Sequence, residues 1–233
     1  MRQGSAVARR RSLFRVLARG VLFAGLALAL TFTGLVALYA VAPPVSTLML
    51  ARTILGKSYV RVYVHLSEVA PVAAASVIAS EDATFCRNHG VDWGALREVL
   101  GGAEGPTRGA STITMQTAKN LFLWPGRSVI RKGIEIPMAL VLGQVWSKAH
   151  TIEIYLNIAE WGDGIFGVEA AAQHYFHKRA SRLDAREAAL LATALPNPIK
   201  RDAAHPSSFQ RRHAAEVMAR VQDNAELTNC LPR

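Results

Sequence analysis

Residues 21–42 read VLFAGLALALTFTGLVALYAVA, from Val21 to Ala42, and contain no charged side chain. At a rise of about 1.5 Å per residue, a helix of this length spans roughly 33 Å, which is enough to cross the hydrocarbon core of a bilayer. The run is longer than the roughly 7–15 apolar residues of a cleaved signal peptide, although Ala40-Val41-Ala42 resembles a cleavage site. We therefore expect a retained transmembrane helix over 21–42, with a cleaved signal peptide as the alternative.

The flanks of this run predict its orientation. Residues 1–20 have no acidic side chain and carry six arginines, namely Arg2, Arg9, Arg10, Arg11, Arg15 and Arg19. A cluster of positive charge stays on the cytoplasmic side of a membrane. We expect a cytoplasmic basic tail over 1–20, a single pass through the inner membrane, and a periplasmic remainder.

The net charge of +10 is concentrated in this tail. Without the six arginines the rest of the chain carries +4, which is a mildly basic domain rather than the footprint of a nucleic-acid-binding protein. Such a domain suits an anionic substrate or an anionic membrane surface. Outside the cytoplasm the two cysteines, Cys86 and Cys230, either form a disulfide or remain as two buried thiols, and the sequence does not choose between these alternatives.

The part after residue 42 divides into two segments. Residues 43–66 are expected to be a membrane-proximal linker, begun by a helix-breaking Pro43-Pro44 and holding apolar residues that keep it near the bilayer surface: Leu48, Met49, Leu50, Ile54 and Leu55. Residues 67–233 are expected to form one mainly helical domain. The best strand candidate is Tyr59–Leu66, because of its Val and Tyr content.

Capping and breaker residues predict the helices of this domain. Ser67 is expected to cap a helix over 68–80 and Asp92 one over 93–100. Residues 101–109 read as a glycine-rich loop. Further helices begin near residue 111 and residue 129, the second interrupted at Gly133, Pro137 and Gly143. Asp184 and Glu187 form a capping-box variant before a helix that Pro196 ends. The last helix, 208–223, should turn Phe209, Val217 and Val221 towards a core.

Three clusters of polar residues are candidates for chemistry. Glu81 and Asp82 lie at the end of an apolar helix and are either a solvated helix end or a general base, since the helix dipole and the neighbouring acid would raise the pKa of a carboxyl group. Thr112, Gln116, Lys119 and Asn120 share one helix face, with Ile113, Thr117 and Leu121 free to pack, and the helix start offers backbone N–H groups to phosphate oxygens. Arg131, Lys132 and Glu135 lie three or four residues apart and form either a surface ion-pair network or a pyrophosphate site.

Two other chemistries find no support in the sequence. The seven histidines show no HExxH or Cys/His spacing typical of zinc sites. No Ser-x-x-Lys motif is present, so an acylating serine of the penicillin-binding type has no candidate.

Taken in order, five stretches resemble the peptidoglycan glycosyltransferases, in particular the monofunctional Gram-negative branch. They begin at Glu81 (EDATFCRNHGVD), Gly109 (GASTITMQTAKNLF), Arg131 (RKGIE), Lys148 (KAHTIEIYLNIAEWGDGIFGVEAAAQHYF) and Ala189 (ALLATALPNP). The resemblance implies a lysozyme-like, α-rich domain with a smaller apolar lobe partly sunk in the membrane. Residues 121–124 (LFLW) belong either to that lobe or to the core.

The resemblance also assigns residues. It implies that Glu81 is the catalytic carboxylate and Glu135 a second essential one, and that Lys119, Arg131 and Lys132 hold pyrophosphate. It places Ser111, Thr112, Gln116 and Asn120 along the same cleft. The sequence departs from the family at Asn88, where a histidine is usual, and at Met115, where many members have glutamine.

The implied reaction joins lipid II units into β-1,4-linked glycan with release of polyprenyl pyrophosphate, on an enzyme that contacts the membrane and other cell-wall synthases or division proteins. No cofactor is assigned, and a divalent cation stays open: Glu135 either orients the cations or binds magnesium or manganese. Two rival hypotheses are a lytic transglycosylase or muramidase, which shares the fold and the catalytic Glu, and a non-enzymatic membrane-anchored scaffold. Paired carboxylates alone do not separate synthesis from cleavage.

Overall fold

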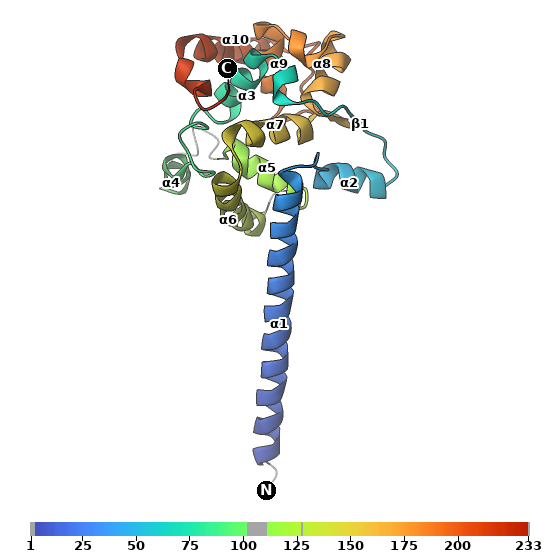
Figure 1. The fold of residues 1–233 in the computed structure, drawn as a ribbon, viewed down its shortest axis with the longest axis vertical. Coiled ribbons are helices and arrows are strands. Elements are labelled where there is room, and N and C mark those ends of the chain that lie inside the picture. The colour runs from blue at the N-terminus through green and yellow to red at the C-terminus, as the bar shows by residue number, and fades with distance from the viewer. Residues whose placement is uncertain (1–2, 102–110, 127, 233) are drawn as a thin grey trace. The chain divides into compact units, whose positions relative to one another are not determined.

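The structure, a computed structural model, describes residues 3–101, 111–126 and 128–232 and is mainly helical, as expected (Figure 1). Most of the expected glycine-rich loop, 102–109, lies outside the described residues, and Gly101 is the last residue of a helix. By its contacts the chain forms two compact units, Met1–Ala42 and Pro43–Arg233.

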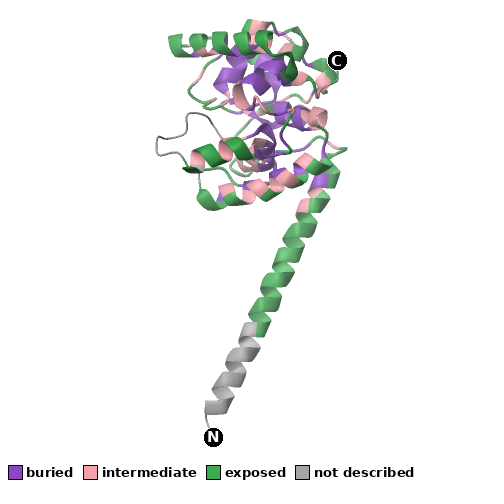
Figure 2. Ribbon diagram, turned by 90° about the vertical axis from the view of Figure 1, so that its left-hand side faces the viewer, coloured by how far each residue is buried: buried purple, intermediate pink, exposed green. Residues whose placement is uncertain are grey.

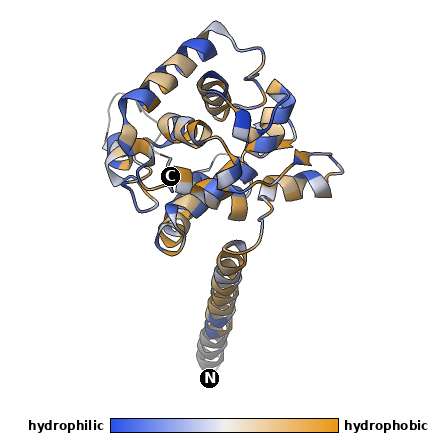
Figure 3. Cartoon of the chain, turned by 45° about the horizontal axis from the view of Figure 1, so that its top comes forward, coloured by the Kyte–Doolittle hydropathy of each residue, from blue (hydrophilic) through white to orange (hydrophobic). Residues whose placement is uncertain are grey.

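The first unit is a single helix, α1 (Gln3–Tyr39). Its segment Arg15–Tyr39 is long and apolar enough to cross a membrane, and Figure 3 shows hydrophobic residues along it. Large apolar side chains such as Leu22 and Phe23 are 70% and 68% exposed, which a water-soluble helix avoids and a lipid-facing helix requires. The helix begins earlier than the expected span of 21–42 and ends at Tyr39, three residues before its predicted end.

The second unit contains the remaining elements. Its helices are α2 (Thr47–Ile54), α3 (Pro71–Glu81), α4 (Trp93–Gly101), α5 (Ile113–Phe122), α6 (Val129–Val145), α7 (Lys148–Ile158), α8 (Val168–Phe176), α9 (Ala185–Ala194) and α10 (Ser208–Asp223). Short 3-10 turns lie at Leu66–Glu68, Ala180–Arg182 and Ala225–Thr228. The expected helix bounds at 93–100 and 208–223 agree with α4 and α10 to within a residue.

This unit contains a larger and a smaller hydrophobic core. The larger core surrounds α3, which is alanine-rich and buried on every side from Ala73 to Ala79, and includes side chains of α7, α8, α9 and α10 (Figure 2). The smaller core joins Val91, Met115 and Ala139 with partly buried residues of α4 and α6. Helix α5 contributes Ile113 to the larger core and Met115 to the smaller one, so it lies between the two.

A small sheet lies beside the larger core. Strand β1 (Val60–Arg61) pairs in parallel with β3 (Ile165–Phe166), and β2 (Glu160–Gly162) pairs with β3 in the antiparallel sense, giving the order β1-β3-β2. The expected strand at 59–66 is therefore present over two residues. Strands β2 and β3 were not predicted, because segments of two or three residues are too short to show alternation.

The segment 43–66, expected to be a linker, lies in the same compact unit as the rest of the domain. The Thr47 hydroxyl lies 2.6 Å from the Leu123 carbonyl oxygen, and Arg52 Nη1 donates to Asp163 Oδ1 at 2.7 Å. Met49 is fully buried, whereas Ile54 and Leu55 are exposed. One face of α2 thus anchors this segment to the domain and the other presents apolar side chains outwards.

Several local expectations need correction. Ser67 does not cap α3: it lies in the 3-10 turn Leu66–Glu68, and Pro71 opens α3, a position where a missing N–H is tolerated. Helix α6 is not interrupted. Pro137 is accommodated inside it, and Gly143 is small because a Cβ there would lie 2.5 Å from the carbonyl oxygen of His89. Phe209 is 57% exposed rather than in the core, while Val217 is fully buried as expected.

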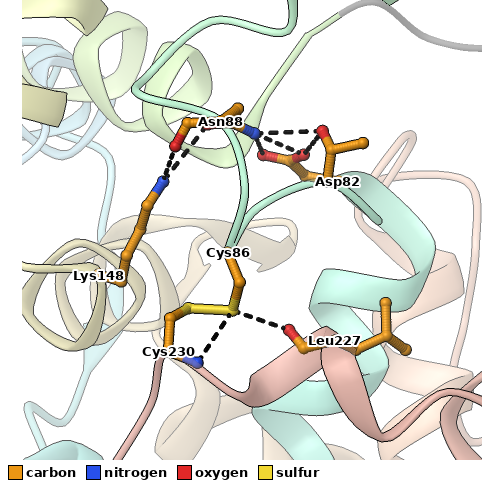
Figure 4. The surroundings of a disulfide bond; sticks show 7 residues. Asp82, Cys86, Asn88, Lys148, Leu227 and Cys230 are labelled. Atoms are coloured by element: carbon orange, nitrogen blue, oxygen red, sulfur yellow. Dashed lines mark hydrogen bonds between the residues drawn. A yellow bond between two sulfur atoms is a disulfide. The ribbon is translucent and has the colours of Figure 1, made fainter.

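Residues 121–124 belong mainly to the core, since Leu121 and Leu123 are buried and Trp124 is half exposed. The cysteines are joined: a Cys86–Cys230 disulfide links the loop after α3 to the C-terminal segment (Figure 4). The sequence left the disulfide and the buried thiols as open alternatives, because the two residues are 144 positions apart.

Candidate active site

Glu81 is the last residue of α3 and lines a cavity of about 540 Å³. Apolar side chains line part of the cavity, namely Ala79, Ala83, Ala95 and Pro196, and its polar lining residues besides Glu81 are Ser80, Asp82, Thr84, Asp92, Ser111, Thr112, Gln116, His213 and Arg220. These polar residues come from the ends of α3, α4 and α5 and from one face of α10. A carboxylate thus lies at the meeting point of four helices, beside a space large enough for a sugar unit.

Two donors fix the Glu81 carboxylate. Gln116 Nε2 donates to Oε2 at 3.0 Å, and Ser80 Oγ donates to Oε1 at 3.3 Å. Burial raises the pKa of Glu81, and these two hydrogen bonds, with the charges of Lys119 and Arg201, oppose the rise. The position of Glu81 in the sequence predicted the direction of this change in pKa but gave the helix dipole and the neighbouring acid as its causes. The structure attributes the change to loss of solvent around the carboxyl group.

Asp82 is the buried companion of Glu81 and holds the surrounding loop. Its Oδ2 accepts from the backbone N–H of Ile113 at 3.0 Å, and its Oδ1 accepts from Asn88 Nδ2 at 3.0 Å. Lys148 Nζ in turn donates to the Asn88 carbonyl oxygen at 2.7 Å, so Asn88 bridges an acid and a cation (Figure 4). Burial raises the pKa of Asp82, and the bonds from Ile113, Asn88 and Thr84 oppose this.

Asn88, which stands where the family usually has histidine, therefore still connects Asp82, Gly90 and Lys148 through hydrogen bonds. The side-chain amide donates to Asp82 while its Oδ1 accepts from the Gly90 N–H at 3.1 Å. Gly90 has φ +100°, and a Cβ there would meet the carbonyl oxygen of Ala139 at 2.2 Å, so only glycine lets this loop cross α6 so closely. The other departure, Met115, is fully buried in the smaller core.

The triplet on α6 is an ion-pair cluster in which Glu135 and Arg131 are buried and the Lys132 side chain is about one-third exposed, not a solvated surface network. Glu135 is 2% exposed and pairs with Arg131 through one oxygen and with Lys132 through the other, the latter at 3.2 Å. Lys132 also donates to Ser111 Oγ at 3.2 Å, which connects α6 to the start of α5. A buried carboxylate shared by two cations orients both of them.

Lys119 lies between the two acidic centres. It lines a second cavity of about 250 Å³ with Asn120, Tyr155 and Glu160, and this cavity shares Gln116 and Pro196 with the one at Glu81. Burial lowers the pKa of Lys119, Glu135 opposes that, Arg131 and Lys132 lower it further, and Glu81 raises it. Glu81, Lys119 and the ion-pair cluster of Arg131, Lys132 and Glu135 are therefore close enough for the charges of the cluster and of Glu81 to act on Lys119.

The predicted binding residues thus fall into two groups. Gln116, Ser111, Lys119 and Asn120 line one or both cavities, whereas Lys132 and Arg131 line neither of the two: Lys132 contacts Ser111, and Arg131 contacts Glu135. Thr112 also lines the larger cavity, but it is 2% exposed, and its hydroxyl donates to the Gly90 carbonyl at 2.6 Å and accepts from the Met115 N–H as the cap of α5. The packing residues expected on the opposite face, Ile113, Thr117 and Leu121, are all buried.

A divalent cation does not fit the residues present. Both oxygens of Glu135 are already taken by cations. Within the part of the chain that the structure describes, no group of three or more His, Cys, Asp or Glu side chains is arranged to hold a metal ion. Of the two roles left open for Glu135, its contacts favour orientation of the cations.

Several residues of the site were not predicted as members of it, among them Tyr155, Arg201, His213 and Arg220. The Tyr155 hydroxyl donates to Gln116 Oε1 at 3.0 Å, and Arg201 acts electrostatically on Glu81. His213 and Arg220 reach the cavity from α10. Tyr155 stands in a stretch that carries the family resemblance, which was a usable signal. Arg201, His213 and Arg220 come from segments whose local pattern predicts only an ordinary helix and loop.

Comparison with known proteins gives one family. A family model described as Transglycosylase matches residues 48–222. A biosynthetic peptidoglycan transglycosylase of Agrobacterium fabrum is 47% identical over 222 residues, covering 94% of this chain and 98% of that protein. Proteins of the same description from Nitrobacter hamburgensis and Brucella suis are 52% and 51% identical over 196 and 190 residues, covering 83% and 81% of this chain and 86% and 85% of theirs.

Proposed function

The chain belongs to the transglycosylase family and is a peptidoglycan glycosyltransferase of cell-wall synthesis, and on that premise we propose that Glu81 is its general base. The observation that carries the proposal is the environment of this carboxylate: a raised pKa, an amide donor that fixes one oxygen, and a partly polar cavity beside it. A raised pKa makes a carboxylate a stronger base at neutral pH than an exposed one.

The reaction proceeds by displacement at a sugar carbon. The 4-hydroxyl oxygen of the acceptor, a lipid-linked disaccharide (lipid II), attacks the anomeric carbon of the growing strand, and Glu81 takes the hydroxyl proton. The bond from that carbon to the pyrophosphate oxygen breaks, and polyprenyl pyrophosphate leaves with the electron pair. Attack from the opposite side inverts an α-linked donor into a β-1,4 bond.

The leaving pyrophosphate needs cations more than it needs an acid, because it is already a stable anion. Lys119, Arg131 and Lys132 supply them in our proposal, with Glu135 holding the last two in place. Preorganised cations in a partly buried site act on developing charge without having to reorient during the reaction. Ser111, Thr112, Gln116 and Asn120 complete the polar walls.

We further propose that α1 anchors the enzyme in the inner membrane with residues 1–20 in the cytoplasm and residues 43–233 in the periplasm. The six arginines of the tail support this orientation. The exposed apolar residues Leu50, Ile54 and Leu55 of the α2 region suit contact with a lipid surface. Protease added to spheroplasts should digest the domain but spare the tail. Digestion of the tail alone would show that the orientation is the opposite of the proposed one.

Polymerisation of purified lipid II by the full-length protein in detergent tests the proposed base. Glu81→Gln should lower kcat by at least about 100-fold, the usual contribution of a general base, without loss of the folded state. Glu98→Gln, a change at an exposed carboxylate, is the matched control and should keep wild-type activity.

The same assay decides between the rival hypotheses. Glycan made by Glu81→Gln at the wild-type rate would refute a catalytic Glu81, and wild-type protein that makes no glycan from lipid II would favour the scaffold hypothesis. Product from finished peptidoglycan but not from lipid II would favour a lytic enzyme.

A further inference from the structure

Gln116 lies between two side chains that lock its amide in one orientation. Its Nε2 donates to Glu81 Oε2 at 3.0 Å, and its Oε1 accepts from the Tyr155 hydroxyl at 3.0 Å. We propose that Tyr155 is a positioning residue of the transfer reaction: its hydroxyl fixes the Gln116 amide, and that amide fixes the carboxylate that receives the sugar proton. This inference rests on the proposed role of Glu81.

The chemistry of the three groups permits only one arrangement. An ionised carboxylate only accepts hydrogen bonds, so Gln116 must turn its NH₂ group to Glu81. A flipped amide would place the lone pairs of Oε1 against the carboxylate. The remaining end, Oε1, then faces Tyr155 and needs a donor, which the phenol provides.

Tyr155 is suited to this task because it stays protonated and does not move. Burial raises the pKa of its hydroxyl well above 10.0, and the charge of Glu81 adds to the rise. Its ring is 1% exposed and packs in the larger core from the middle of α7. The hydroxyl is therefore a permanent donor held at one point in space, and the direction of both hydrogen bonds follows from it.

The chain of hydrogen bonds from Tyr155 through Gln116 to Glu81, called the relay below, gives the two oxygens of Glu81 different roles. Oε2 is held by Gln116 at 3.0 Å, whereas Oε1 has the longer contact of 3.3 Å with Ser80. We assign the sugar proton to Oε1. Since the bond from Gln116 lowers the pKa of Glu81, weakening the relay should raise that pKa.

Other charged groups around Glu81 must be held constant in any test of this kind. Lys119 on α5 and Arg201 after α9 lower its pKa. Asp82, Asp92, His213 and Arg220 line the same cavity from α3, the start of α4, and α10. Replacing Tyr155 by phenylalanine changes none of these groups, which makes it a clean perturbation.

The experiment measures lipid II polymerisation by full-length Tyr155→Phe over a range of pH. Loss of one neutral hydrogen bond that acts through Gln116 should lower kcat roughly three- to tenfold, with KM within about twofold of wild type. The acidic limb of the kcat/KM profile should move to higher pH. Tyr175→Phe removes a comparable hydroxyl, which donates to the Trp161 carbonyl at 3.1 Å instead of to Gln116, and should leave the limb in place.

A double-mutant cycle separates the relay from a general loss of packing. Gln116→Ala removes the link, so adding Tyr155→Phe to it should cost little further activity, and the two effects should not add. Additive effects, or an acidic limb that stays at its wild-type pH in Tyr155→Phe, would overturn the inference.

The inference can still be tested if Tyr155→Phe fails to fold. If Tyr155→Phe does not accumulate, Gln116→Asn replaces it, because the shorter amide cannot span both 3.0 Å contacts. An unshifted limb in that variant also overturns the inference. Failure of the proposed function is separate: it is shown by an active Glu81→Gln, whatever Tyr155→Phe does.

Discussion

The disulfide between Cys86 and Cys230 joins residues 144 positions apart, and its removal should destabilise the folded protein strongly. In the chain-entropy model, a disulfide that closes a loop of this length lowers the conformational entropy of the unfolded chain. This raises the free energy of unfolding by about 5 kcal/mol at 25 °C, which is the upper end of measured values. For a unit of the size of Pro43–Arg233, each kcal/mol shifts Tm by about 2–4 °C, so a fall of roughly 10–20 °C is expected.

Urea unfolding of the full chain in detergent micelles, followed by tryptophan fluorescence, measures this effect. Wild type should be compared with Cys86→Ser/Cys230→Ser, each with and without a thiol reductant. Reductant should lower the stability of wild type to that of the double variant and leave the double variant unchanged. Cys86 follows Glu81 by five residues, so loosening the loop should also reduce kcat.

A difference in unfolding free energy below about 1 kcal/mol would refute this reasoning, because so small an effect is typical of an ordinary surface change rather than of a long closed loop. It would mean that the unfolded chain is already restricted, or that the loop after α3 is held by its hydrogen bonds alone. A large loss with no response of wild type to reductant would assign the effect to the serine side chains instead.

Two further predictions follow from the buried acids. Burial raises the pKa of Glu81 above its ordinary 4.5, so its contribution to stability is fully present below the unfolded pKa and is lost as pH rises through the folded pKa. Glu81→Gln should therefore be more stable than wild type near pH 7, by roughly 1.4 kcal/mol for each pH unit between the folded and unfolded pKa of Glu81, and equal to it near pH 4 in denaturant unfolding. Asn88→Leu removes the donor to Asp82 and an acceptor of Lys148, and should cost about 1–3 kcal/mol and lower kcat in the lipid II assay; unchanged stability would show that the network is not needed.

Local chemistry predicted much of the fold. The N-cap at Asp92, the capping box of Asp184 and Glu187, and the bounds of α10 all depend on contacts within a few residues, and all are present in the structure. The same local logic failed at Gly133, Pro137 and Gly143. The role of Gly143 depends on a neighbour distant in sequence: the close approach of the 88–90 loop to α6 turns this glycine from a breaker into a packing residue.

The candidate site divides in the same way. Spacing along one helix was enough to group Arg131, Lys132 and Glu135, but not to show that Glu135 is buried and satisfied by both cations. The contact between Tyr155 and Gln116 joins residues 39 positions apart on two helices, and no periodicity in either helix indicates it. Burial depth and partners across helices are properties of packing, and a single sequence carries them only through family resemblance.

An acid and the cations near it attract one another, and direct pairing would lower the pKa of the acid and weaken it as a base. The two carboxylates, Glu135 and Glu81, have different kinds of contact. Glu135 takes Arg131 and Lys132, whereas the side chains that donate hydrogen bonds to Glu81, Gln116 and Ser80, are neutral. The hydrogen-bond donors of Glu81 therefore carry no charge, and burial keeps the pKa of Glu81 raised. In the proposed mechanism Glu135 therefore orients Arg131 and Lys132 for the pyrophosphate, while Glu81 is left for the sugar proton.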